Sequence, residues 1–282
     1  MPYFILFPRD DHDPLIDAKD RTYHIVMLGI PERRNQPELL DLPHDSYARE
    51  ELEGALQDLT LVNSCLGNGR AVLKHLAAMN AETAEKGFTV LDVATGMADI
   101  PITIAKWARK EGIRVSITAV DLDPLIMKIA RKRSETYPEI TLAVADGFDL
   151  PFAKKSFDCV LCSKTAHHFS DEKVLQMIRE FSRVARRGFV IVDLRRSWIA
   201  YILIFLLTRL FSRNRLTRSD GPLSVLKSFT PGELAALASR NGTSVFRVSK
   251  EPFWLIVLDG RVRQASPISG RNGTGGHRDL SG

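Results

Sequence analysis

The sequence predicts an α/β protein of the doubly wound, Rossmann-like class, with helices on both faces of a mostly parallel sheet of seven strands. Two observations support this prediction. After residue 87, short apolar runs alternate with amphipathic stretches, which is typical of repeated strand–helix–strand units. The last two extended runs have no helix between them, so they should form an antiparallel pair at the sheet edge.

The apolar spacing places each element along the chain. We expect strands at residues 88–93, 115–121, 140–145, 157–163, 189–193, 244–248 and 253–258. We expect helices at residues 99–110, 124–136, 171–186, 198–211 and 231–240, and two more within 47–79, divided by a break at 66–69. The basic stretch between the apolar helix at 198–211 and residue 231 is interpreted as a loop.

These elements suggest one main domain with additions. We expect a loosely ordered leader over residues 1–40, a domain over 45–260 and a disordered tail over 261–282. Within the domain, residues 45–85 form a helical cap and residues 196–228 form an insertion after the fifth strand.

Composition narrows the function. The 282 residues are 44% hydrophobic and 26% charged, which suits a globular domain, and a net charge of only +5 argues against a nucleic-acid partner. The three cysteines form no even-numbered disulfide framework, and the opening MPYFILFP lacks the positive start of a signal peptide. We therefore expect a cytoplasmic location.

Three acids stand at three successive strand ends, namely Asp92, Asp121 and Asp146. In open α/β sheets ligands bind at the carboxyl edge of the strands, and Asp121 is placed to accept from ribose hydroxyls. The turn after Asp92 contains the single glycine Gly96, whereas a nicotinamide cofactor would favour a turn with several glycines. An NAD-dependent oxidoreductase therefore remains an alternative only.

The exit of the fourth strand, SFDCVLCSKTAHHFSD, carries the candidate catalytic residues. His167 or His168 could accept a proton near neutral pH, and the sequence does not decide which of them faces the site. No cluster of histidine and carboxylate residues stands at metal-ligand spacing, so no metal is expected.

Together, VLDVATGMADIP, AVDLDP, VADGFDLPF and FDCVLCSKTAHHF resemble the class I S-adenosylmethionine-dependent methyltransferases. The resemblance covers roughly residues 45–258 and is closer to the branch containing ubiquinone and menaquinone biosynthesis methyltransferases. The stretch VARRGFVIVDLRRS and the residues after it are similar to a bacterial subgroup that modifies phenolic, quinone or polyketide-type molecules.

The resemblance implies S-adenosylmethionine as the cofactor and assigns roles to residues that match its motifs. It implies cofactor-binding roles for Asp92, Ala94, Gly96, Asp121, Leu122, Asp146, Gly147 and Ser163. Ala94 and Ala98 stand where glycines are common in this family, and each adds a Cβ that could crowd the cofactor. A cofactor-binding protein without catalysis is therefore a second alternative.

The apolar run WIAYILIFLLTRLF predicts an apolar acceptor. Its 14 residues are too few for a confident transmembrane helix. One interpretation is a lid over the acceptor pocket, and the other is a membrane-surface helix flanked by arginines across residues 198–218. The sequence thus predicts methylation of a small phenolic, quinol or polyketide-like acceptor at oxygen or carbon.

Overall fold

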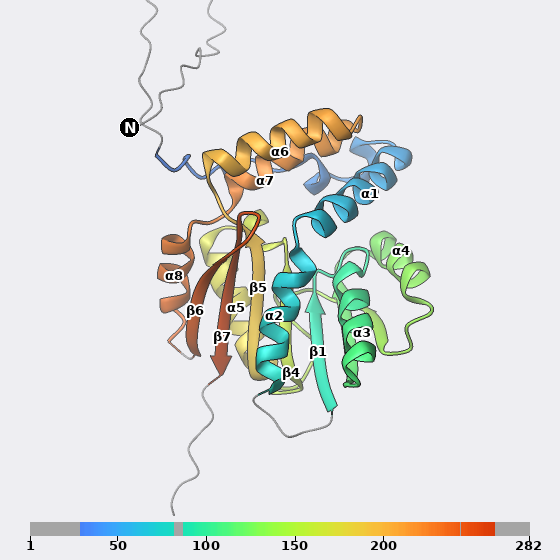
Figure 1. The fold of residues 1–282 in the computed structure, drawn as a ribbon, viewed down its shortest axis with the longest axis vertical. Helices are drawn as coiled ribbons and strands as arrows, with labels where there is room; N and C mark the ends of the chain where they lie inside the picture. The colour runs from blue at the N-terminus through green and yellow to red at the C-terminus, as the bar shows by residue number, and fades with distance from the viewer. Residues whose placement is uncertain (1–28, 82–86, 243, 263–282) are drawn as a thin grey trace, which may run out of the picture.

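The computed structural model describes residues 29–81, 87–242 and 244–262, and these contain one seven-stranded sheet (Figure 1). The strands lie in the order β3-β2-β1-β4-β5-β7-β6. Their bounds are β1 (Gly87–Val93), β2 (Arg114–Asp121), β3 (Ile140–Val144), β4 (Phe157–Ser163), β5 (Ala185–Leu194), β6 (Ser244–Glu251) and β7 (Leu255–Val262). The doubly wound class is confirmed.

Strand directions follow from the connections. The pairs among β1 to β5 are parallel, whereas β7 is antiparallel to both β5 and β6. The antiparallel strand therefore lies one place in from the edge, and β6 is the edge strand. The expected last strand at 253–258 begins later, because Phe253 and Trp254 have positive φ and form the turn between β6 and β7.

Helices cover both faces of the sheet, with α2 and α3 on one face and α5 and α8 on the other (Figure 1). The helices are α1 (Arg49–Cys65), α2 (Asn68–Ala81), α3 (Asp99–Glu111), α4 (Pro124–Ser134), α5 (Asp171–Val184), α6 (Trp198–Phe211), α7 (Arg215–Lys227) and α8 (Pro231–Ser239). Short 3-10 turns are η1 (Leu39–Asp41), η2 (His44–Ser46) and η3 (Ala166–His168). Strand residues alternate between the two cores, so that Leu161 packs toward α2 and Val160 toward α5.

The prediction of a basic loop after α6 is wrong, because residues 215–227 form α7. Asn214 caps the helix by accepting from the backbone N–H groups of Leu216 and Thr217. Leu216, Leu223 and Val225 are buried on its inner side. The pair Gly221-Pro222 lies inside the helix, and because this pair is typical of a turn, the sequence predicts no helix here.

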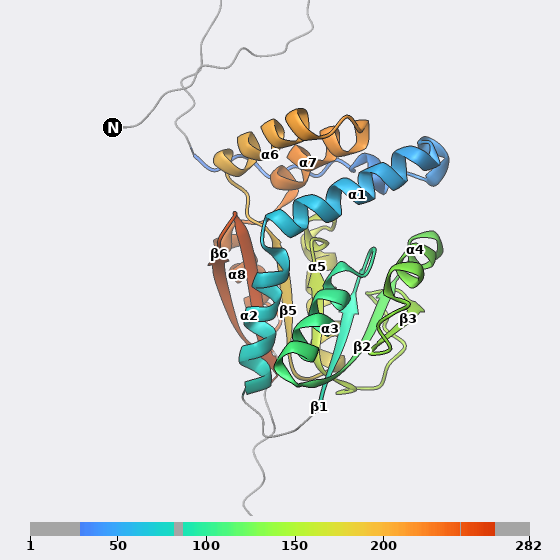
Figure 2. The ribbon, with the colours of Figure 1, turned by 45° about the vertical axis from the view of Figure 1, so that its right-hand side comes forward.

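Residues 29–46, here called the N-terminal strap, run across α7 beneath α6 (Figure 2). The backbone N–H groups of Leu39 and Leu40 donate to the Asp220 carboxylate of α7 at 2.8 and 3.0 Å. The Arg33 guanidinium lies 3.7 Å from the centre of the Phe229 ring. The expected leader is thus held by specific contacts from residue 29 onward, and its first 28 residues lie outside the described part, as does the tail from residue 263.

Candidate cofactor and acceptor site

The turn after β1 has the backbone of a glycine-rich loop although two of its residues are alanines. Ala94, Gly96 and Ala98 have φ of 56°, 54° and 61°. A left-handed backbone costs a residue with a Cβ about 1–2 kcal/mol, so both alanines are strained. Ala98 is fully buried at the start of α3, whereas Ala94 faces a cavity. Of the two alanines, therefore, only Ala94 has a Cβ that could crowd a ligand.

Asp121, at the end of β2, holds this turn. Its Oδ2 accepts from the backbone N–H of Gly96 at 2.9 Å, and its Oδ1 accepts from the N–H of Asp123 at 3.1 Å. The adjoining strand tip carries Asp146, which is exposed, and Gly147, where an added Cβ would lie 2.8 Å from Val93 Cγ1. The three strand ends therefore lie side by side, as the sequence predicts.

Asp92 lies deeper than its neighbours. It is 2% exposed, and its Oδ2 has no hydrogen-bond partner within the described residues. Burial raises the pKa of Asp92 to about 7, and the nearby Asp121 carboxylate adds to this effect. A cationic ligand group would supply both the missing donor and the compensating charge.

Two cavities open at this edge. The first, about 580 Å³, reaches from the turn and Ser163 to the inner sides of α6 and α7. The second, about 590 Å³, is lined by Ala94, Asp121 and His168. Leu122, which is 67% exposed, Asp146 and Gly147 line neither cavity and follow β2 and β3 along the open edge.

The end of β4 is fixed from across the first cavity. The Asn68 side-chain amide, at the start of α2, donates to Ser163 Oγ at 2.9 Å, and the Ser163 hydroxyl lies 3.1 Å from Asn68 Oδ1. Asn68 is 2% exposed. The predicted Ser163 thus meets the cavity together with a partner that sequence reasoning missed.

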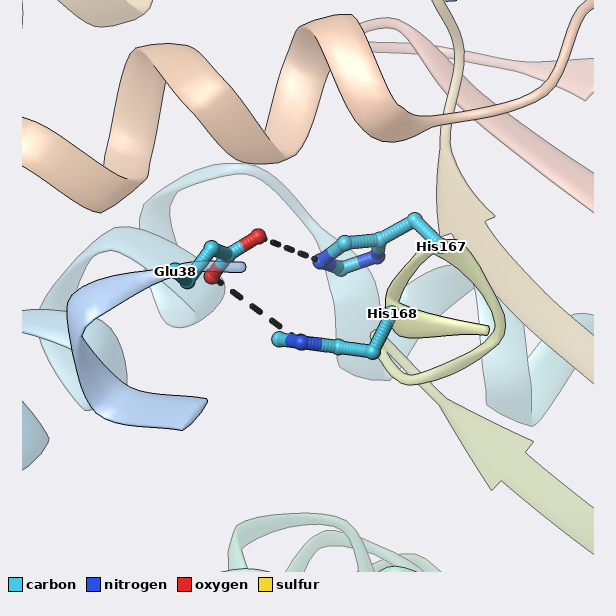
Figure 3. Close-up of side chains that lie close together, drawn as sticks. All are labelled: Glu38, His167 and His168. Atoms are coloured by element: carbon cyan, nitrogen blue, oxygen red, sulfur yellow. Dashed lines mark ion pairs between the residues drawn. The ribbon is translucent and has the colours of Figure 1, made fainter. Parts of the chain in front are cut away.

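His167 lies between the carboxylates of Asp193 and Glu38, and Figure 3 shows its contact with Glu38. Its Nδ1 is 2.7 Å from Asp193 Oδ1 at the end of β5, and its backbone N–H donates to Asp193 Oδ2 at 3.0 Å. Its Nε2 is 3.5 Å from Oε1 of Glu38 in the N-terminal strap. Burial alone would lower the pKa of His167, but the carboxylates of Asp193 and Glu38 together outweigh burial and raise that pKa to about 9.

His168 stacks beside His167 and is more accessible. The two ring centres are 4.3 Å apart, and His168 Nδ1 lies 2.8 Å from Asp41 Oδ1. Its side chain is 23% exposed. Both histidines line the first cavity, so the structure places both candidate bases there.

Sequence reasoning missed two carboxylates of this cluster. Asp193 ends a strand as Asp92, Asp121 and Asp146 do, so the same rule could have identified it. Glu38 lies in a segment without hydrophobic periodicity, and no sequence signal joins it to His167.

Glu38, His167 and His168 also bring three potential metal ligands within 4.8 Å of one another. Two features argue against a metal ion bound by these three side chains. Lys227 Nζ lies 3.5 Å from Glu38 Oε1, so a cation is already present. The imidazole planes are only 33° apart, so their lone pairs converge poorly on one point. We therefore assign no metal to the cluster.

Comparisons with known proteins agree with this geometry. Residues 90–188 match the family described as a methyltransferase domain. Demethylmenaquinone methyltransferase of Lysinibacillus sphaericus is 29% identical over 125 residues, which cover 44% of this chain and 49% of that protein. The protein of the same name from Thermotoga maritima is 29% identical over 186 residues, covering 60% and 74%.

Over residues 90–188 the chain is therefore similar to methyltransferases, in agreement with the resemblance that its motifs carry. The fold also resembles that of magnesium protoporphyrin IX methyltransferase from Synechocystis PCC 6803 with bound SAH, at a TM-score of 0.50 and 17% identity. That match covers 70% of this chain and 84% of the other. The chain spans about half the length of several relatives it matches.

The His167–Asp193 contact predicts an unusual titration. In nuclear magnetic resonance spectra the His167 imidazole should titrate near pH 9, and Asp193→Asn should move the midpoint down by at least one unit. Because the folded pKa exceeds the ordinary 6.5, this contact stabilises the fold fully below pH 6.5, and its contribution is lost as the pH rises through about 9.

Asp41→Asn is the matched control, because Asp41 contacts His168 and makes no contact with His167 in this cluster. It should leave the His167 midpoint near its original value. A wild-type midpoint at or below 6.5 would show that burial outweighs the two carboxylates, Asp193 and Glu38.

Proposed function

We propose that the domain transfers a methyl group from S-adenosylmethionine to a small apolar acceptor, phenolic or quinol- or polyketide-like, at oxygen or carbon. The observation that carries this proposal is the first cavity, which joins the turn after β1 to the imidazole of His167. Its outer part is lined by Leu40, Leu56, Ile204 and Leu207. The names of the menaquinone-related relatives support an acceptor of this kind.

The residues present fit the cofactor. The unpartnered Asp92 Oδ2 suits the ammonium of the methionine part, and Asp121 suits the ribose hydroxyls. Ala94, Gly96 and Ser163 would border the methionine side, while Leu122, Asp146 and Gly147 would border the adenine. The bound cofactor supplies a methyl group activated by a sulfonium.

The chain's own task is to orient the acceptor and remove its proton. Asp193 fixes the His167 ring through Nδ1, which leaves Nε2 for the proton. His168 Nδ1 also lies against a carboxylate, but Asp41 is more exposed than Asp193 and makes no bond to the His168 backbone, so we assign the base to His167. A phenol or enol that gives its proton to Nε2 becomes the nucleophile.

The Asp92 assignment predicts a defect in cofactor affinity. Asp92→Asn should weaken S-adenosylmethionine binding about tenfold to a hundredfold, because a charged hydrogen bond contributes ~1.5–3 kcal/mol. Isothermal titration calorimetry should show wild-type affinity rising from pH 6 to 7.5, as Asp92, with its pKa of about 7, loses its proton.

Asp149→Asn is the control, because Asp149 is exposed near the same edge and lines neither cavity. Equal affinities of the Asp92→Asn variant and the wild type would remove Asp92 from the cofactor site.

The base assignment predicts a defect in turnover. With radiolabelled cofactor and a panel of phenols and quinols, His167→Gln should lower kcat about 10²–10⁴-fold, whereas His168→Gln should cost less than about tenfold. The base must be neutral, so the wild-type kcat/KM should rise as the pH is raised from about 6 to about 8, toward the His167 pKa of about 9.

Unchanged turnover in His167→Gln would contradict the base assignment. Tight cofactor binding without transfer to any acceptor of the panel would instead support the non-catalytic alternative. The absence of a nucleic-acid partner and the cytoplasmic location remain predictions from composition.

We further propose that α6 contacts an anionic membrane surface. The large apolar side chains exposed on this helix are Ile199, Leu203, Phe205, Leu206, Leu207, Leu210 and Phe211. Residues 195–218 contain six arginines and no acidic residue, and Arg209 and Arg213 are exposed at the end of the apolar face. Within the part of the chain that the structure describes, no helix is long and apolar enough to cross a membrane. An apolar face with a basic border suits a helix lying on anionic lipid.

This surface predicts lipid-dependent sedimentation. The protein should sediment with vesicles containing phosphatidylglycerol more than with pure phosphatidylcholine. About 0.5 M salt should weaken the binding, because salt shortens the Debye length over which the arginines attract anionic lipid. Replacing Leu210 and Phe211, which are 75% and 77% exposed, by glutamate should abolish it.

Val245→Glu, on the exposed edge strand, is the matched control and should leave vesicle binding intact. If the α6 variant instead turns a dimer into a monomer and the wild type ignores vesicles, the face joins two copies of the chain, and the membrane proposal fails.

A further inference from the structure

Lys164 follows β4 directly and has a strained backbone. Its φ is 58°, in the left-handed region that costs a lysine about 1–2 kcal/mol. Its backbone N–H donates to Val192 O on β5 at 2.8 Å, which holds this conformation. Strained residues persist where the surrounding fold supports them, and they gather at functional sites. The turn therefore fixes the point at which the Lys164 side chain leaves the sheet.

The Lys164 side chain is half-buried, lines the first cavity and forms no hydrogen bond or ion pair with any described residue. Lys227, which contacts the carboxylates beside the histidines, differs. It is 3% exposed and its Nζ lies 3.5 Å from Glu38 Oε1 and 3.1 Å from Asp41 Oδ2. The described chain thus supplies carboxylates for Lys227 and none in contact with Lys164.

Asp193 is close enough to attract Lys164 but is already engaged. Its Oδ1 is 2.7 Å from both His167 Nδ1 and the N–H of Leu194, and its Oδ2 accepts from the His167 N–H. Burial lowers the pKa of Lys164 to about 8, although Asp193 opposes this, so the ammonium remains the major form at neutral pH. A half-buried cation without a contacting partner carries a desolvation cost, and a ligand anion would offset it.

We propose that Lys164 selects acceptors that react as oxyanions, with the phenolate or enolate oxygen between the Lys164 ammonium and the His167 imidazole. This inference rests on the proposed methyl transfer and narrows its substrates to acidic hydroxyl compounds, in preference to neutral alcohols and amines. His167 lines the same cavity, and both residues follow the same strand.

The proton and electron balance closes without another reactant. The acceptor hydroxyl gives its proton to neutral His167, and Lys164 stabilises the resulting oxyanion. The new bond to the methyl group forms at that oxygen, or at the carbon it activates, while the carbon–sulfur pair returns to sulfur. Attack by carbon is followed by loss of that carbon's proton to solvent.

The test uses 4-nitrophenol, whose phenolate form is visible by its absorbance. Titrated into the full chain with S-adenosylhomocysteine present, it should bind with its apparent pKa lowered by about one unit or more, since an opposite charge at contact distance shifts a pKa by ~1–3 units. Lys164→Met should abolish the shift, and Lys164→Arg should keep most of it.

Two controls separate recognition from damage to the fold. Lys106→Met removes an exposed cation that lines another part of the same cavity and should preserve the shift. Lys164→Asn, whose side chain tolerates the left-handed backbone, should behave as Lys164→Met does. Binding of the non-ionising analogue 4-nitrobenzyl alcohol should be the same in all variants.

Failure of this inference is distinguishable from failure of methyl transfer. If the wild type binds 4-nitrophenol only as the neutral phenol or not at all, or if Lys164→Met retains the shift, the oxyanion role of Lys164 is wrong. Radiolabelled methyl transfer to other acceptors, dependent on His167, would still support the proposed function.

Discussion

The acceptor side of the proposed site depends on one buried carboxylate, that of Asp193. It accepts from the backbone N–H and lies against Nδ1 of His167, so it fixes both the 3-10 turn η3 and the direction of the imidazole ring. Both oxygens of this carboxylate already have partners in His167 and Leu194, and Lys164 lies near the carboxylate without a contact. Asp193 therefore both orients His167 and leaves a second cation available to a ligand.

The two halves of the proposed site, one for the cofactor and one for the acceptor, have different origins. The cofactor half is made by successive strand ends and the turns that follow them, with Asp121 bonded to the backbone of Gly96. The acceptor half is assembled from distant segments, since Glu38 reaches His167 only because the strap is bound to Asp220 of α7. Ser224 of the same helix donates to Glu38 at 2.9 Å. The strap and the insertion after β5 therefore act together on one cluster.

This division explains what the sequence could predict. The strands, most helices and the acids at strand ends follow from local periodicity and from the rule that parallel strands end at one edge. Glu38 could not be predicted, because its contact spans more than a hundred residues of sequence. Helix α7 was missed because Gly221-Pro222 suggests a turn, although burial of Leu216 and Leu223 overrides that local preference. The alanines were expected to crowd the cofactor, yet the fold turns Ala98 inward and leaves only Ala94 to do so.

The charges around His167 balance one another, and this balance would hold throughout the proposed methyl transfer. With His167 protonated, the cations His167, Lys164 and Lys227 face the carboxylates Glu38, Asp41 and Asp193, so the described cluster is balanced. An acceptor oxyanion adds one negative charge, and the sulfonium of the cofactor adds one positive charge beside it. Methyl transfer converts both into neutral groups at once, while the charges of the protein stay as they were. A site balanced before and after the reaction has no need to reorganise buried charges during it, which is the condition under which fixed charges contribute most to lowering a barrier.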